Sequence, residues 1–456
     1  MEKQFKEQGG AATMDPGVIL RWLTSRVMSH VTEPGRLERA HRKAERVRAK
    51  AGDRHRVDYF HQVEDGYSHL AAQVLHRLAD RYDIDLVCHL VSGPSGNNSP
   101  EPDLLLQLSR YDAQKVAPAY GLAFPPHPEA PDPELVSLAE SVLAHQSNIE
   151  FAEYAEAVGA ALWSGDKAAL LQYAKQWGQA DTRSVAQCIA SGNERLRALK
   201  HYSSAMFYYG GEWYWGVDRL YHLERRFREL GVDRHAGLPP LAPRPVETGT
   251  LKDNGSLTLE FFPSMRSPYT AISFDRTVKL ARETGVNLVV RPVLPMVMRG
   301  VPATRQKGMY IFSDTAREAA AAGVPFGNFY DPIGDPVRKG YALYQWACEQ
   351  GRGNEFFSAF LRCAFALGVN LNRPKGLQQA VEMAGLNWSA AQMHTDDESW
   401  EALLEANRGA MYGAGLWGVP SFRLTDKKGK ECLATWGQDR LWLVAREIQR
   451  QLSSVD

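Results

Sequence analysis

The sequence predicts an α/β protein in which one domain type occurs twice. Each half of the chain opens with an apolar strand-like run, a helix and a second apolar run, and closes with two strands and a helix. A long helical stretch separates the two parts in each half. The strand–helix–strand order favours a parallel strand pair with a right-handed crossover. A chain of 456 residues is also too long for one ordinary core and fits two domains of roughly 200 residues each.

The first half begins with a strand at residues 57–60, a helix at 67–82 and a second apolar run at 84–91. A short hairpin follows the helical stretch, because Gly210-Gly211 separates two strand-like runs. The closing elements are strands at 205–209 and 212–215 and a helix at about 218–230.

The second half repeats this order. Residues 257–262 predict a strand, a helix continues through Thr284, and residues 286–290 predict a second strand. The stretch to about Leu404 is helical. The closing elements are strands at 421–425 and 431–435 and a final helix from Asp439.

Four segments follow from these patterns. Residues 1–54 form a helical N-terminal extension, and residues 55–237 form the first domain. Residues 238–256 are rich in proline and glycine and make the best linker. Residues 257–456 form the second domain.

The extension contains two helical patterns. Residues 18–31 carry apolar residues at helical spacing, and residues 36–50 are rich in basic residues with Glu38 and Glu45 among them. A membrane-surface or nucleic-acid role for the basic run is the alternative. We favour a solvated helix face with mixed charges.

Composition limits the partners. The chain has 53 basic and 53 acidic side chains, so its zero net charge gives no global reason to expect nucleic acid or an anionic membrane. No apolar run approaches the roughly 20 residues that span a bilayer. The five cysteines form no Cys-x-x-Cys pair and have no zinc-ligand spacing to histidine. We therefore expect a cytoplasmic protein with reduced thiols and without a metal.

The turn after the strand at 257–262 reads Ser267-Pro268-Tyr269-Thr270. A thioredoxin-type redox enzyme carries Cys-x-x-Cys at such a strand-to-helix turn, whereas this chain has a hydroxyl residue at both cysteine positions. Further along lie Gly418-Val419-Pro420-Ser421-Phe422 and Trp436-Gly437-Gln438-Asp439-Arg440-Leu441. These motifs together indicate a site that binds a thiol without being one.

With the pattern Lys307-x-x-Tyr310-x-x-x-Asp314-x-x-Arg317 added, residues 257–450 resemble a known family. They are similar to the glutathione-dependent 2-hydroxychromene-2-carboxylate isomerases and kappa-class glutathione transferases of the DsbA-like thioredoxin superfamily. The resemblance implies tandem thioredoxin-like (DsbA-type) domains, each a βαβ…ββα core with a large helical insertion. It also implies glutathione as cofactor, a small-molecule substrate and a place in aromatic catabolism.

The resemblance implies a role for each motif. Ser267 would hold a glutathione thiolate at a helix N-terminus, where the dipole favours an anion, although a plain N-cap is its alternative role. Pro268 and Tyr269 flank it, and Val419 and Pro420 would form a cis-proline loop, with an ordinary trans proline as the alternative.

The same resemblance places the γ-glutamyl end of glutathione at Gln438 and Asp439, for which a plain helix cap is the alternative. Arg299 and Tyr310 are substrate-side candidates. Arg299 would steady a carboxylate or else lie at the surface, and Tyr310 would face the pocket or pack. The family's Lys- and Asn-containing loop is lost at residues 295–302, which puts the chromene substrate in doubt.

The first half has a similar layout, but other residues replace the motifs of the site. Asp65-Gly66-Tyr67 stands where Ser267-Pro268-Tyr269 stands, and Ala205 stands where Pro420 stands. The segment 215–220 still echoes 436–441. An aspartate at this turn would repel a thiolate, so we expect this copy to serve packing or partner contact.

Three function classes follow. The first is a glutathione-dependent isomerase, with a kappa-type transferase as its close alternative. The second is a non-catalytic DsbA-like binding or scaffold protein. The third, a dithiol oxidoreductase, is disfavoured because none of the cysteines lies at the site positions. A homodimer and an internal pseudo-dimer are both left open.

Overall fold

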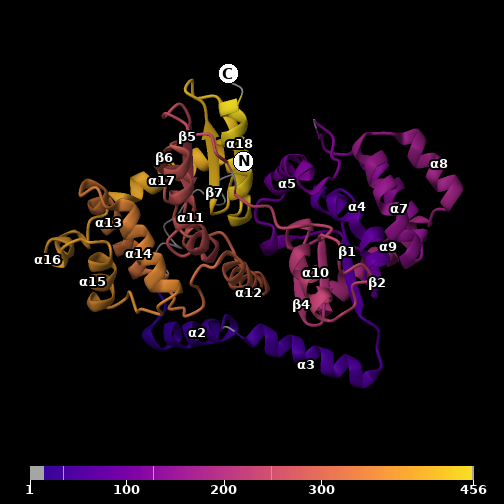
Figure 1. Cartoon of the computed structure of the whole chain (residues 1–456), viewed down its shortest axis with the longest axis horizontal. Helices are drawn as coiled ribbons and strands as arrows, with labels where there is room; N and C mark the ends of the chain where they lie inside the picture. Colours follow the sequence, from indigo (N-terminus) through magenta and orange to yellow (C-terminus); the bar gives the residue numbers. More distant parts are fainter. Residues whose placement is uncertain (1–14, 34, 127, 248, 454–456) are drawn as a thin grey trace. The chain divides into compact units, whose positions relative to one another are not determined.

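The computed structural model describes residues 15–33, 35–126, 128–247 and 249–453 (Figure 1). The chain divides into two compact units. The N-terminal unit is Glu38–Val246, and the C-terminal unit combines the chain up to Leu37 with the chain from Glu247 onward. Each unit is described by itself.

The N-terminal unit is built on a four-stranded sheet with the order β2-β1-β3-β4. Strand β1 pairs in parallel with β2 and antiparallel with β3, and β3 pairs antiparallel with β4. The strands are β1 (Arg56–His61), β2 (Asp85–Leu90), β3 (Met206–Tyr209) and β4 (Glu212–Trp215).

Helices of this unit follow β1, fill the stretch between β2 and β3, and close the chain after β4. They are α3 (Arg36–Ala51, most of which lies in this unit), α4 (Gly66–Arg81), α5 (Pro102–Val116), α6 (Pro133–His145), α7 (Asn148–Trp163), α8 (Lys167–Trp177), α9 (Thr182–Ala198) and α10 (Leu220–Glu229).

The C-terminal unit has the same sheet plan, with the order β6-β5-β7-β8. Its parallel pair is β5 with β6, and its antiparallel pairs are β5 with β7 and β7 with β8. The strands are β5 (Thr258–Phe262), β6 (Asn287–Val290), β7 (Ser421–Thr425) and β8 (Glu431–Trp436). Phe261 and Phe422 stack across the central pair with ring centroids 5.1 Å apart.

Nine α-helices are seen among the described residues of this unit. They are α2 (Val18–Val31), α11 (Pro268–Thr284), α12 (Arg305–Ala322), α13 (Asp335–Glu349), α14 (Gly353–Phe365), α15 (Pro374–Met383), α16 (Trp388–Ala391), α17 (Trp400–Gly413) and α18 (Leu441–Ser453).

The predicted fold class is confirmed, because both sheets have the same strand order and the same directions. The strand predicted at 421–425 has those bounds in the structure. The closing helix predicted from Asp439 starts differently, since a 3-10 turn at Gln438–Arg440 precedes α18. That short turn follows Gly437, whose φ is 127°.

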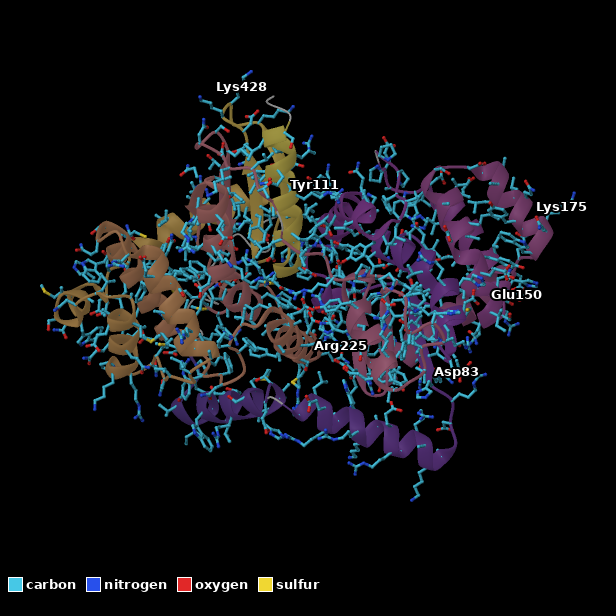
Figure 2. All side chains as sticks on the ribbon, in the orientation of Figure 1. Asp83, Tyr111, Glu150, Lys175, Arg225 and Lys428 are labelled. Carbon is cyan, nitrogen blue, oxygen red and sulfur yellow. The ribbon has the colours of Figure 1, made fainter. Side chains whose placement is uncertain are left out.

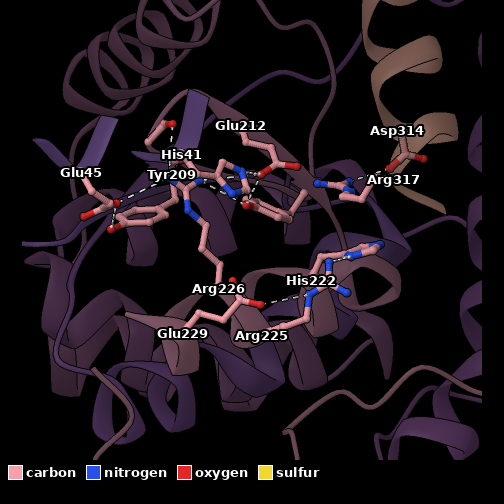
Figure 3. A network of polar contacts seen from close by, with 12 residues as sticks. His41, Glu45, Tyr209, Glu212, His222, Arg225, Arg226, Glu229, Asp314 and Arg317 are labelled. Carbon is pink, nitrogen blue, oxygen red and sulfur yellow. Dashed lines mark hydrogen bonds and ion pairs between the residues drawn. The ribbon is translucent and has the colours of Figure 1, made fainter. Parts of the chain in front are cut away.

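The predicted N-terminal extension contributes to both units. Helix α2 groups with the C-terminal unit, whereas most of α3 groups with the N-terminal one. Figure 3 shows how α3 is held: His41 Nε2 lies 2.5 Å from Glu212 Oε2, and Glu45 Oε1 accepts a hydrogen bond from the Tyr209 hydroxyl at 2.7 Å. The domain limits that we expected remain a proposal.

Both units carry exposed lysines on their outer surface. In Figure 2, Lys428 extends from the turn between β7 and β8, and Lys175 from the last turn of α8. Among the described residues, no helix is long and apolar enough to cross a membrane.

Candidate functional site

Ser267 is the N-cap of α11 in the C-terminal unit. Its Oγ accepts a hydrogen bond from the backbone N–H of Thr270 at 3.2 Å, and Pro268 occupies the first helical position, where no N–H is needed. The same Oγ lies 3.5 Å from the carbonyl oxygen of Val419, to which it donates. The N-cap role is therefore real, and the structure brings Ser267 together with the distant Val419.

The Val419-Pro420 peptide bond is cis, as the resemblance implied. The Pro420 carbonyl accepts a hydrogen bond from Gly437 N–H at 3.0 Å, which ties the loop to the chain after β8. Gly418 is required here, because a Cβ at this position would lie 2.2 Å from the Trp436 indole. The loop, the Ser267 turn and the turn at 437 thus form one cluster.

Tyr269 points into the helical insertion. Its hydroxyl donates to Asp314 Oδ2 at 2.8 Å, and Arg317 donates to Asp314 Oδ1 at 2.6 Å. The pair Asp314–Arg317 is seen in Figure 3. This contact fastens the first turn of α11 to α12, so the Tyr269 hydroxyl has a structural role.

Gln438 has its side-chain amide in a buried polar network. Its Nε2 donates to Glu318 Oε2 at 2.9 Å, and its Oε1 accepts from Arg276 at 3.3 Å. Asp439 follows it, with a side chain that is 14% exposed and a carboxylate oxygen that lies 3.6 Å from the Arg440 guanidinium. Of the two residues, Asp439 is the one whose side chain reaches solvent.

Arg299 is buried, so its alternative placement at the surface is wrong. It donates to the Trp417 carbonyl at 3.2 Å, while its Nε and Nη1 have no hydrogen-bond partner among the described residues. Burial lowers the pKa of Arg299, and the Tyr412 side chain opposes that shift. A guanidinium with buried, unmatched N–H groups is costly unless an anion or water meets them.

Lys307 also lies in the region of Trp417, although the sequence analysis named it only as part of a motif and not as a candidate site residue. Its Nζ lies 5.5 Å from the centroid of the Trp417 ring. Burial lowers the pKa of Lys307 to about 8. Tyr310 lies one turn further on α12 and is half-buried. The signal was present, because Lys307 opens the Lys-x-x-Tyr pattern, but that pattern does not show which member approaches Trp417.

The N-terminal unit carries Asp65 at the equivalent turn, as the N-cap of α4. Its Oδ2 accepts from Ser68 N at 3.0 Å, from Ser68 Oγ at 2.9 Å and from Ser204 Oγ at 3.4 Å. Its Oδ1 accepts from Tyr67 N at 3.4 Å. Burial raises the pKa of Asp65 against these hydrogen bonds. The carboxylate of Asp65 thus occupies the place at the N-terminus of α4 where an external anion would otherwise bind.

Ala205 stands in this unit where Pro420 stands in the other. Its carbonyl accepts from Gly216 N–H at 2.7 Å, just as Pro420 accepts from Gly437. Ala205 has a φ of 56°, a left-handed conformation that is uncommon for a residue with a Cβ. The geometry therefore supports the residue match that the sequence suggested.

Two further hydrogen bonds repeat between the units. The Tyr67 hydroxyl donates to Asp112 at 2.9 Å over 45 residues, which matches Tyr269 and Asp314. Ser68 Oγ accepts from Gln62 N at 3.2 Å, and the equivalent bond in the C-terminal unit is 3.3 Å long. The two turns are built alike around different cap residues.

Cysteine does not take part in these turns. The five free cysteines are Cys88, Cys188, Cys348, Cys363 and Cys432. Burial raises the pKa of each of these thiols. Within the described part of the chain, no cluster of His, Cys, Asp and Glu side chains is arranged to hold a metal ion.

Residues 258–449 match the DSBA-like thioredoxin domain family. Solved structures that are similar include a 2-hydroxychromene-2-carboxylate isomerase (18% identity, 44% of this chain and 99% of that one, TM-score 0.36). A probable DsbA oxidoreductase from Streptomyces coelicolor is also similar (18%, 44% and 91%, TM-score 0.34). So is the cytosolic disulfide reductase DsbM from Pseudomonas aeruginosa, solved with GSH (14%, 43% and 98%, TM-score 0.33).

A search of curated protein sequences found no match. The family match covers the four strands of the second sheet and most of α18, and the first sheet has the same strand order. The C-terminal half of this chain therefore has a DsbA-like thioredoxin fold.

Proposed function

We propose that the C-terminal unit binds glutathione and acts as a glutathione-dependent isomerase resembling 2-hydroxychromene-2-carboxylate isomerase. The observation that carries the proposal is the position of Ser267 Oγ between the Thr270 N–H and the Val419 carbonyl. Bound glutathione would supply a thiolate that attacks an electrophilic carbon of an aromatic or unsaturated acid.

Ser267 is suited to hold such a thiolate. Its bond to Val419 O is long at 3.5 Å, so the hydroxyl proton can turn toward a sulfur at little cost. The Thr270 N–H meanwhile continues to donate to Oγ, and the N-terminal end of α11, a 17-residue helix, favours negative charge. A hydrogen bond to an ionised acceptor is stronger than a neutral one.

The surrounding residues fit glutathione in part. Val419 presents backbone beside the cis bond, and Pro268 shapes the first turn of α11. Asp439 is the candidate for the γ-glutamyl amine. The Gln438 side chain does not fit a ligand role, because Glu318 and Arg276 already engage its amide. Gln438 would therefore contribute its backbone.

The substrate side is cationic. The Arg299 guanidinium, whose Nη2 donates to the Trp417 carbonyl, and the ammonium of Lys307 both contact Trp417, and Arg299 has two further buried nitrogens without a hydrogen-bond partner among the described residues. We propose that Arg299 steadies a substrate carboxylate and that Tyr310 faces the same region. With a pKa of about 8, Lys307 keeps its charge at neutral pH and adds to this attraction.

The proposal excludes dithiol chemistry at this site, because serine cannot form a disulfide and burial raises the pKa of every cysteine thiol. The proposed substrate is a small molecule of the cytoplasm, and neither nucleic acid nor a membrane is a proposed partner. For the oligomeric state, an internal pseudo-dimer and a homodimer are the two alternatives. A kappa-type transferase would use the same thiolate and retain it in the product. A scaffold protein would not bind glutathione.

Calorimetry with glutathione tests this function. The wild type should bind at millimolar ligand or below. Ser267→Gly should weaken binding about tenfold by removing one charge-assisted hydrogen bond, while costing the helix cap only a few tenths of a kcal/mol. Ser267→Thr keeps a hydroxyl cap and should bind nearly normally. If no heat of binding is seen at millimolar glutathione, the enzyme proposal is contradicted and the scaffold protein is the function that remains.

A further inference from the structure

Helix α2 packs on the C-terminal unit with its polar side chains inward. Arg21 is 1% exposed and Ser25 is buried, whereas Ile19 is 76% exposed and Trp22 is 50% exposed. A helix that docks through the hydrophobic effect buries its apolar stripe instead. Directional hydrogen bonds must therefore hold α2 in place.

These hydrogen bonds run to one segment, residues 327–333, which has neither helix nor strand. The contacts pair Thr32 Oγ1 with Gly327 O (2.8 Å), Ser29 Oγ with Phe329 O and N (3.0 and 2.9 Å), Ser25 Oγ with Asp331 N (3.0 Å), and Arg21 Nη1 with Asp331 O and Ile333 O (2.8 and 2.6 Å). Side chains about one helical turn apart thus satisfy backbone groups of the extended segment, as a neighbouring strand would.

Asp331 connects this segment to the site. Its carboxylate accepts two parallel hydrogen bonds from Arg266, at 2.8 and 2.9 Å. Such a bidentate pair fixes orientation as well as distance. Arg266 directly precedes Ser267, and α2 holds Asp331, like Phe329, by both its N–H and its carbonyl.

We propose that α2 is a strap that positions Ser267 through residues 327–333 and the Asp331–Arg266 pair. Arg21, Ser25, Asp331 and Arg266 are then positioning residues. Residues 18–31 belong to the thiolate site in this account, although about 240 residues of sequence separate them from it. The consequence for thiolate binding rests on the proposed function of Ser267.

The coupling has a physical basis. Removing the hydroxyl of Ser25 or Ser29 leaves a backbone N–H or carbonyl of residues 327–333 without its partner on α2. Local opening of that segment then becomes easier, and the opening extends to whatever the segment holds. Because Asp331 holds Arg266, the turn at 264–270 should open together with it.

Amide hydrogen exchange on the full chain tests the strap without any ligand. In the double variant Ser25→Ala/Ser29→Ala, protection of the Thr270 N–H, which donates to Ser267 Oγ, should fall about tenfold. The matched control is Thr24→Ala. Thr24 lies on the same helix but bonds only to Leu20 O and Arg21 O within it, so Thr270 should keep its protection.

Faster exchange at 327–333 with unchanged protection at Thr270 would overturn the strap. If the double variant does not fold, Ser29→Ala alone is measured with the same two readouts. A glutathione titration of the wild type is separate. If Thr270 keeps its protection in the variant while the wild type binds glutathione, only the strap is refuted. If Thr270 loses protection in the variant while the wild type does not bind glutathione, only the proposed function is refuted.

Discussion

The two turns that follow β1 and β5 share their backbone plan and differ in one charge. Ser267 leaves its proton next to a carbonyl 3.5 Å away, whereas Asp65 places a carboxylate there and surrounds it with donors from Tyr67, Ser68 and Ser204. The Ser267 turn therefore has a hydroxyl that can donate to an external anion. At the Asp65 turn, a carboxylate of the protein already occupies that position. The same backbone arrangement can thus leave the anion position free for a ligand or fill it with a side chain.

The largest expected effect comes from making the C-terminal turn resemble the other one. Ser267→Asp keeps a good N-cap, so stability should change little. A carboxylate within about 4 Å of a thiolate costs several kcal/mol in a partly buried site, so glutathione affinity should fall about 100-fold or more. Calorimetry on the variant measures this.

The control for that change is Asp65→Ser in the N-terminal unit. It should leave glutathione affinity unaltered, because the binding site lies elsewhere, and it should add no second site beside Ala205. A second binding event in this variant, or unchanged affinity in Ser267→Asp, would show that the charge at the turn does not decide binding.

The units should also differ in acid stability. Burial lowers the pKa of His61 to about 3, of His69 to about 4 and of His201 to about 3, all in the N-terminal unit. These side chains stay neutral when folded but gain a proton when unfolded below pH about 6.5, so stability falls as pH drops from there toward the folded pKa values. Each histidine contributes a loss of about 1.4 kcal/mol per pH unit.

Hydrogen exchange at pH 7 and pH 5 should therefore show the N-terminal unit weakening first. The described histidines of the C-terminal unit are His30, which is exposed, and His394, which is half-buried. Burial raises the pKa of Asp331 in this unit, but Arg266 lowers it further, so the net shift is downward; the stability that this carboxylate contributes is lost only as pH falls below about 4. Equal weakening of both units at pH 5 would contradict this assignment.

The smallest expected effect concerns the position that replaces Pro420. Ala205 has a φ of 56°, which glycine adopts more readily. Ala205→Gly should stabilise the N-terminal unit by about 0.5–1 kcal/mol in denaturant unfolding. Ala71→Gly, inside helix α4, should instead destabilise it by about 1 kcal/mol. A loss of stability in both variants would mean that Ala205 is not strained.

The repeated fold could be predicted from the order of strands and helices, whereas the place of Val419 beside Ser267 was implied by the family resemblance. The sequence did not predict the surroundings of Gln438 and Arg299, because their partners Glu318 and Trp417 come from distant parts of the helical insertion. Nor did it predict the face of α2. Apolar spacing indicated a helix, but Arg21 and Ser25 are the residues it buries.

A crystal structure of the full chain with glutathione tests the central claim most directly. The account predicts one glutathione per chain, with its sulfur within about 3.5 Å of Ser267 Oγ and its backbone paired with Val419. A sulfur placed away from Ser267, or a glutathione bound at Asp65, would contradict it.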